Sequence, residues 1–152
     1  MNRFNNVIFG QKAFIIKDGK ILIMRRKEAD IFEGLWDIPG GKLEEEDSLF
    51  GGIAREIKEE VGLDLIKILL TLSTSKFIGS KREHPVIFRN IYLCTAAGEI
   101  TLSNEHSEYL WVKPEELPNY QFPDDPDFQS ALKRLPVILN EIDNKTDYSK
   151  IY

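Results

Sequence analysis

The chain has 152 residues, 42% of them hydrophobic, which is enough for one domain with a substantial buried core. Charged residues of both signs are abundant, the formal net charge is −5, and the pI is near 5.1. This composition argues against a disordered chain and against a protein that binds duplex DNA through a basic surface. No stretch approaches the roughly 18 apolar residues of a membrane span, and the N-terminus lacks the apolar segment of a signal peptide, so we expect a cytoplasmic protein.

The first 41 residues read as short strands joined by turns. Two β-rich runs, 7–16 and 21–24, are separated by KDGK, whose Asp-Gly pair is typical of a β-hairpin. Arg25-Arg26-Lys27 follows at the end of the second run. LWDIP then predicts a short strand that ends at a Pro-Gly-Gly turn at 39–41. Trp36 and Phe32 are both candidates for stacking on a base. Trp36 shares a strand face with Ile38, however, so a core position is the other interpretation of Trp36.

A helix is predicted next, over residues 48–61. Asp47-Ser48 is typical of an N-cap, and Gly62 of a C-cap that adopts a left-handed conformation. Apolar residues recur at every fourth position between the caps, at Leu49, Ile53, Ile57 and Val61.

The second half of the chain continues the alternation of strands and helices. We expect strands at 65–72 and 86–95 with a polar loop over 75–85 between them, a short strand at 109–112 and a helical turn at 114–117. A helix is predicted over 128–142, bent or interrupted by Pro136, and the tail 143–152 is expected to be poorly ordered. These elements predict an α/β sandwich around a mixed sheet, with one domain over 1–142. Cys94, the single cysteine, is expected to be a buried core thiol.

Acidic residues are concentrated around the predicted helix. Seven acids and three bases lie between Gly41 and Leu63. At 100° per residue, Glu56, Glu59 and Glu60 share an arc of roughly 100° on the helix. A solvated surface would explain such a cluster, but like charges four residues apart and acids near a helix C-terminus are both unfavourable. Clustered carboxylates beside a glycine turn are the oxygen ligands that Mg²⁺ or Mn²⁺ prefers, and we therefore expect a metal site.

The spacing of this segment resembles the Nudix box, G-x5-E-x7-R-E-U-x-E-E-x-G-U, in which U is a bulky aliphatic residue. Eight of the nine fixed positions match, namely Gly41, Arg55, Glu56, Ile57, Glu59, Glu60, Gly62 and Leu63. The ninth is Asp47, where the family has Glu, so the expected pairing of this acid with Arg55 could be looser or shifted. LWDIPGGKLE and NEHSEYLWV also look like Nudix segments, and the likeness spans roughly residues 8–140.

The resemblance implies the Nudix α/β/α sandwich and hydrolysis of a diphosphate linkage in a nucleotide. Carried over position by position, it implies that Glu56 and Glu60 are the principal metal ligands. Glu59 shares in the cluster and in catalysis, and the carbonyl of Gly40 or Gly41 completes the coordination. Arg55 orients Glu56 and the turn.

Outside the box, the resemblance points to four further residues. Glu105, six residues before Trp111, matches the extra glutamate of MutT-like members as a general base or additional ligand, with Glu108 as a competitor. Arg26 is a candidate for contacting the substrate. Asp124 and Asp125 lie where related purine-triphosphate hydrolases place base-reading residues, although a helix cap at Asp125 or Asp127 is equally consistent with the sequence.

Substrate class follows only by elimination of the markers of other Nudix subfamilies. A MutT-like hydrolase of an unmodified or oxidised nucleoside triphosphate is the leading hypothesis. Pyrophosphatases of ADP-ribose or another nucleoside-diphosphate sugar form the alternative, and a non-catalytic nucleotide-binding domain is a third. Dimerisation is left open.

Overall fold

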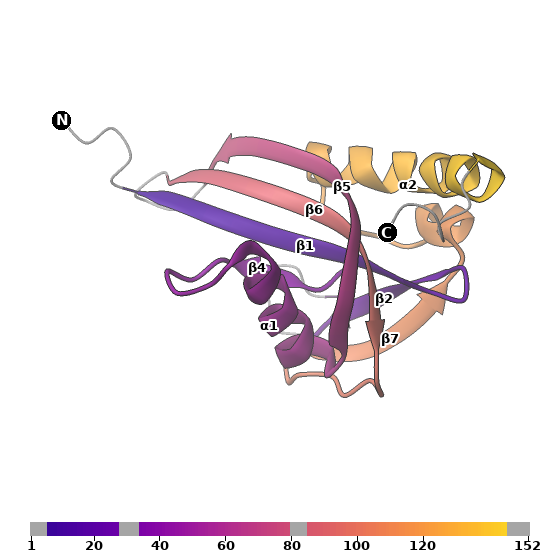
Figure 1. Ribbon diagram of the computed structural model, residues 1–152, viewed down its shortest axis with the longest axis horizontal. Coiled ribbons are helices and arrows are strands. Elements are labelled where there is room, and N and C mark those ends of the chain that lie inside the picture. Colours follow the sequence, from indigo (N-terminus) through magenta and orange to yellow (C-terminus); the bar gives the residue numbers. More distant parts are fainter. Residues whose placement is uncertain (1–5, 28–33, 80–84, 146–152) are drawn as a thin grey trace.

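Strand β1 (Val7–Lys17) is the strand around which the sheet is arranged (Figure 1). The computed structural model describes residues 6–27, 34–79 and 85–145. β1 pairs antiparallel with β2 (Lys20–Arg26) and parallel with β6 (Val86–Ala97). Between β1 and β2, Asp18 and Gly19 have φ angles of 51° and 72°, which suit a two-residue hairpin turn. The hairpin predicted from KDGK is therefore confirmed.

The other strands extend the sheet on both sides of this central pair. At one edge β5 (Asp64–Ile78) pairs with β6, and at the other β3 (Trp36–Asp37) pairs with β2. β7 (His106–Val112) also pairs with β2, and β4 (Gly40–Lys42) pairs with β1. Of these pairings only that of β1 with β6 is parallel, so the predicted mixed sheet is confirmed.

Within the described part of the chain, two α-helices cover opposite faces of the sheet. Helix α1 (Leu49–Val61) places Ile53 and Ile57 against Ala13 and Ile15 of β1 in one buried cluster. Phe14, which points the other way because side chains alternate along a strand, belongs to the second cluster, with helix α2 (Pro126–Lys145). Figure 1 shows one helix on each side of the strands, and the α/β/α layers are confirmed.

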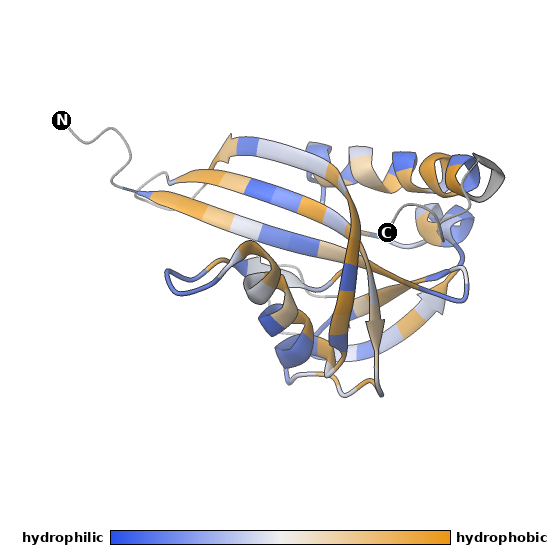
Figure 2. Cartoon of the chain, in the orientation of Figure 1, coloured by the Kyte–Doolittle hydropathy of each residue, from blue (hydrophilic) through white to orange (hydrophobic). Residues whose placement is uncertain are grey.

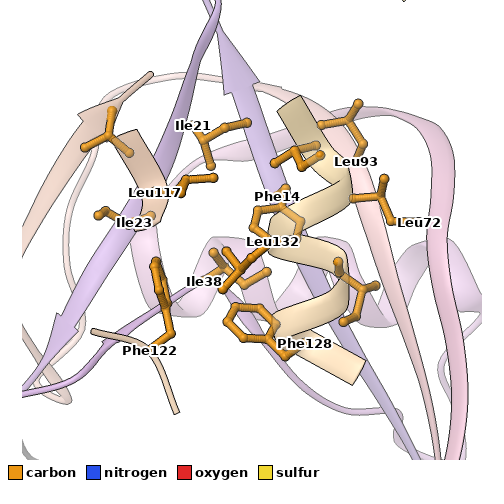
Figure 3. Packing of buried hydrophobic residues seen from close by; sticks show 14 residues of the cluster. Phe14, Ile21, Ile23, Ile38, Leu72, Leu93, Leu117, Phe122, Phe128 and Leu132 are labelled. Carbon is orange, nitrogen blue, oxygen red and sulfur yellow. The ribbon is translucent and has the colours of Figure 1, made fainter. Parts of the chain in front are cut away.

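The cluster under α2 is the larger of the two (Figure 3). Phe14 and Phe128 stack with their ring centroids 5.8 Å apart, and Phe122 meets Phe128 edge to face at 5.6 Å. The 3₁₀ helix η1 (Pro114–Asn119) adds Leu117 to this cluster, which confirms the helical turn predicted there. Figure 2 shows the matching pattern of hydropathy, with apolar and polar segments alternating along β1 and hydrophilic residues toward the end of α1.

Both caps of α1 form as the sequence predicts. Ser48 accepts a hydrogen bond from the Gly51 N–H, and Gly62 has a φ of 74°. A methyl group at Gly52 would lie 2.4 Å from the Leu43 side chain, so this helical glycine is explained by close packing.

Three element boundaries differ from the prediction by three residues or more. β5 runs to Ile78, so the expected loop over 75–85 is wrong for 75–78, where the residues pair with β6 and alternate between half-buried and exposed. β7 begins at His106 rather than at 109, because it pairs along β2 as far as Arg26. α2 includes Pro136 and continues to Lys145, three residues into the expected tail, while 146–152 lie outside the described residues.

No helix within the described parts of the chain combines the length and the apolar composition needed to cross a membrane. Cys94 is fully buried among the residues under α1, and burial raises the pKa of its thiol to about 12. The prediction of a core cysteine is therefore confirmed.

Candidate active site

The glycine turn and α1 meet face to face in the middle of the predicted box. β4 carries Gly40 and Gly41 alongside β1, opposite Lys12 and Gln11. A methyl group at Gly41 would lie 2.3 Å from the carboxyl carbon of Glu56, and one at Gly40 would lie 2.2 Å from the Gln11 carbonyl oxygen. Both glycines are therefore needed for close approach, Gly40 to the neighbouring strand and Gly41 to a box carboxylate.

Glu60 lies on the same side of α1 and is fixed to the same turn. Its carboxylate accepts a hydrogen bond of 2.9 Å from the Gly40 N–H. Burial raises the pKa of Glu60 to about 7, although the Gly40 hydrogen bond and the Lys12 charge favour the ionised form. Burial also raises the pKa of Glu56. Both carboxylates are thus partly desolvated and gain from a nearby cation.

Arg55 gathers the other acids of the box. Its guanidinium donates to Asp47 at 2.8 Å, to Glu56 at 3.0 Å and to the Lys42 carbonyl at 3.1 Å. The Asp47 hydrogen bond helps to hold the pKa of Arg55 above its usual range, and Arg55 in turn lowers the pKa of Asp47. The shorter acid at the one mismatched box position therefore still reaches the box arginine.

Glu59 is the most exposed of the three box glutamates. Its side chain is 59% exposed and lies 3.5 Å from Arg55. In the described residues, no group of three or more histidine, cysteine or carboxylate side chains is gathered tightly enough to hold a metal ion by itself. The donors are nevertheless all oxygens, and two of them are desolvated beside a glycine turn, which fits a hard divalent cation in chemistry.

The segment that carries Glu105 is attached to the end of α1. The Thr101 and Ser103 N–H groups donate to the carbonyls of Val61 and Glu60, each at 2.9 Å. Glu105 itself is exposed, and its carbonyl accepts from the Lys27 N–H at 3.0 Å. Glu108, the competing candidate, instead forms a surface ion pair with Arg25 at 3.1 Å. The fold thus brings the backbone of the Glu105 segment to the box helix.

Arg26 forms an ion pair with a residue that the sequence reasoning did not select. Its guanidinium lies 3.0 Å from Asp37, which is 4% exposed and also accepts from Lys12 at 2.6 Å. Burial opposes ionisation of Asp37, but the Lys12 and Arg26 charges outweigh it and lower its pKa. Arg26 therefore belongs to a partly buried ionic group next to the box turn.

Asp125 has two structural partners, and Asp124 lies beside it at a groove. Asp125 caps α2 by accepting a hydrogen bond of 3.0 Å from the Phe128 N–H, which agrees with the capping role considered for it. It also accepts two hydrogen bonds from Arg89, at 2.5 and 3.0 Å. Burial raises the pKa of Asp125, but its hydrogen bonds with Arg89 and the helix outweigh this and lower it. Asp124 and Asp125 line a groove of about 710 Å³ whose lining also includes Phe77 and Ile87.

Trp36 meets Tyr120 edge to face, with ring centroids 5.2 Å apart, and both rings pack against the core under α2, in agreement with the core interpretation of Trp36. Phe32 lies outside the described residues.

Lys12, Asp37 and Arg89 are the polar residues of this region that the sequence reasoning missed. Each is the single charge of an otherwise uncharged run within a strand, in GQKAF, LWDIP and IFRNI. Charged residues are almost never buried without a partner, so an isolated charge in an apolar strand is the signal that points to them. Their partners could not be paired from the sequence, because they come from different strands.

Comparisons with known proteins agree with this architecture. The model of the NUDIX domain matches residues 11–134. The chain is 30% identical over 115 residues to a protein named nucleoside triphosphatase NudI from Escherichia coli K12, an alignment that covers 70% of this chain and 82% of that protein.

Solved structures also match. The structure of a MutT protein from Methanosarcina mazei Go1 has a TM-score of 0.69 and 27% identity, and covers 93% of this chain and 97% of its own. The E. coli ORF135 protein has a TM-score of 0.72 and 25% identity, with 88% of this chain and 91% of that chain covered. With the box geometry described above, these matches define the class: the chain belongs to the Nudix family. It is a Nudix hydrolase, an enzyme that acts on phosphoanhydride bonds.

Proposed function

We propose that this hydrolase cleaves a nucleoside triphosphate, unmodified or oxidised at the base, to the monophosphate and pyrophosphate with the help of a divalent cation. The observation that carries the proposal is the pair of desolvated carboxylates, Glu56 and Glu60, held against the box glycines beside the cations Lys12 and Arg26. This juxtaposition suits a phosphate chain, since it offers ligands for a metal and positive charge for phosphate oxygens. The name of the E. coli relative, a nucleoside triphosphatase, supports the same substrate class.

Glu56, Glu59 and Glu60 are the residues we propose to hold the cation, with the carbonyl of Gly40 or Gly41. Mg²⁺ is the first choice and Mn²⁺ the second, because all the donors are oxygens. When bound, such a cation offsets phosphate charge and lowers the pKa of a bound water.

The remaining residues act around this centre. Arg55 donates to Glu56 and to the Lys42 carbonyl, and so fixes the carboxylate relative to the turn. We assign Glu105 as the general base that takes the proton from the attacking water, while the anhydride P–O bond breaks and pyrophosphate leaves. We propose that Arg26 contacts phosphate oxygens. Asp124 and Asp125 line the groove, and we propose that they contact the nucleoside.

Measuring phosphate products on a substrate panel with Mg²⁺ tests the proposal. The panel contains unmodified and oxidised (deoxy)nucleoside triphosphates, ADP-ribose, NADH and dinucleoside polyphosphates. We expect the triphosphates to have the highest kcat/KM, and equally slow turnover of every compound would contradict the proposed substrate class. Glu60→Gln is expected to abolish turnover while the protein stays folded, and retained activity would contradict the metal assignment.

A further inference from the structure

A small polar cavity lies between the box and the groove. It has a volume of about 170 Å³, and its lining includes the cations Lys12, Arg26 and Arg89 and the carboxylates of Asp37 and Asp125. Asp125 also lines the larger groove, so the cavity and the groove share a wall. Three cations against two carboxylates leave one net positive charge in the cavity.

Lys12 connects this cavity to the box. Its backbone pairs with Gly40, and a methyl group at Gly40 would lie 2.8 Å from its Cγ, so the Lys12 side chain packs directly against the glycine that holds Glu60. The Lys12 Nζ then lies 2.6 Å from Asp37 and 5.8 Å from the centre of the Phe128 ring. The Lys12 side chain is 22% exposed and forms part of the cavity lining.

The three cations differ in how many of their N–H donors already bind Asp37 or Asp125. Arg89 uses both terminal nitrogens on Asp125, and Arg26 donates to Asp37 from Nε and Nη2. Lys12 makes one hydrogen bond from its ammonium, to Asp37, within the described residues. An ammonium has three N–H donors, so two are available for the oxygens of an anionic ligand.

We propose that Lys12 is a phosphate-binding residue of this enzyme and that Asp37 is the positioning residue that aims it. The inference rests on the proposed function, since a nucleotide with phosphates at the box and its nucleoside in the groove would lie next to this cavity, which shares Asp125 with the groove and Lys12 with the strand beside Gly40. Asp37 is suited to its role because Oδ1 accepts from Lys12 and from the Ile38 N–H, while Oδ2 accepts from Arg26. One buried carboxylate thereby separates two cations and fixes their direction.

The experiment compares wild type with Lys12→Met, Lys12→Gln and the control Lys17→Met. Lys17 is at the exposed end of the same strand, so the control removes the same charge away from the cavity. Lys12→Gln keeps a donor for Asp37 and serves if Lys12→Met does not fold. Calorimetry with Mg²⁺ gives the Kd of inorganic tripolyphosphate, and steady-state kinetics gives KM and kcat for a nucleoside triphosphate.

We expect both Lys12 variants to weaken tripolyphosphate binding about 10- to 100-fold, the effect of losing a charge-assisted hydrogen bond, and to raise KM more than they lower kcat. Lys17→Met should match wild type. A folded Lys12 variant with unchanged Kd and KM, an equal effect of Lys17→Met, or a wild type that does not bind tripolyphosphate would overturn the assignment. If wild type binds tripolyphosphate but hydrolyses no nucleoside triphosphate, the proposed substrate fails and the Kd comparison still decides the role of Lys12.

Discussion

Replacement of Gly41 by alanine tests whether the closeness of the turn to α1 matters for catalysis. The added methyl group would lie 2.3 Å from Glu56 Cδ and 2.4 and 2.6 Å from its two oxygens. An ordinary contact begins near 3.4 Å. All three of these atoms belong to the Glu56 side chain, so the clash is relieved if the carboxylate moves by about 1 Å while the backbone stays in place. Such a displacement of a catalytic group costs about 100-fold in rate, which corresponds to about 2.7 kcal/mol in activation free energy.

The assay is kcat/KM for the best triphosphate of the substrate panel, measured with thermal unfolding of the same preparations. Gly41→Ala should lose about 100-fold in kcat/KM and little stability, because the atoms in its way belong to a flexible side chain. Gly40→Ala should instead be strongly destabilised, because its methyl group would overlap the Gln11 carbonyl and the Lys12 Cα.

Gly51→Ala is the matched control for Gly41→Ala. Its methyl group meets only the Ser48 side chain, at 2.9 Å from the hydroxyl oxygen, and alanine favours the helix. Activity close to wild type is expected. If Gly41→Ala retains full kcat/KM while folded, the position of the Glu56 carboxylate does not limit turnover, and the reasoning is refuted.

Two predictions concern stability. Because the pKa of Glu60 is about 7 in the folded protein and 4.5 ordinarily, folding takes up a proton between these values, and the metal-free protein should lose stability as pH rises through this window. For wild type, this loss in the free energy of unfolding is at most roughly 3 kcal/mol, and Glu60→Gln should remove it. Urea unfolding with EDTA at pH 5 and pH 8 measures the difference, and an equal change with pH in the two proteins would contradict the prediction. Arg89→Met leaves Asp125 without its ion-pair partner and should lower the free energy of unfolding by about 3 kcal/mol in the same urea assay, whereas a change below about 1 kcal/mol would show that the pair is weak.

The box helix could be predicted in detail because its signals are local. The caps Ser48 and Gly62 and the apolar spacing from Leu49 to Val61 lie within one continuous segment. Both caps form, and Ile53, Ile57 and Val61 are buried, whereas Leu49 at the start of the helix is 57% exposed. The closeness of Glu56 to Gly41 could also be expected from the sequence, since only residues 42–48 separate the glycine turn from the helix.

The ionic group beside the box could not be predicted, because it depends on the register of distant strands. Lys12, Asp37 and Arg89 come from β1, β3 and β6, and the parallel pairing of β1 with β6 joins segments that are separated by the whole box. The loop expected over 75–85 failed for a related reason. Residues 75–78 are polar or half-exposed, and only their partner strand reveals them as part of β5.

The parallel pairing of β1 with β6 also bears on the order in which the enzyme can assemble during synthesis. A nascent chain that ends before Val86 contains every carboxylate of the box and the whole of α1, but not the strand that completes the middle of the sheet. Pairing over such a sequence distance is slow, because a long loop must close before any contact forms. We therefore expect the box to become competent only after the C-terminal half of the chain has emerged from the ribosome.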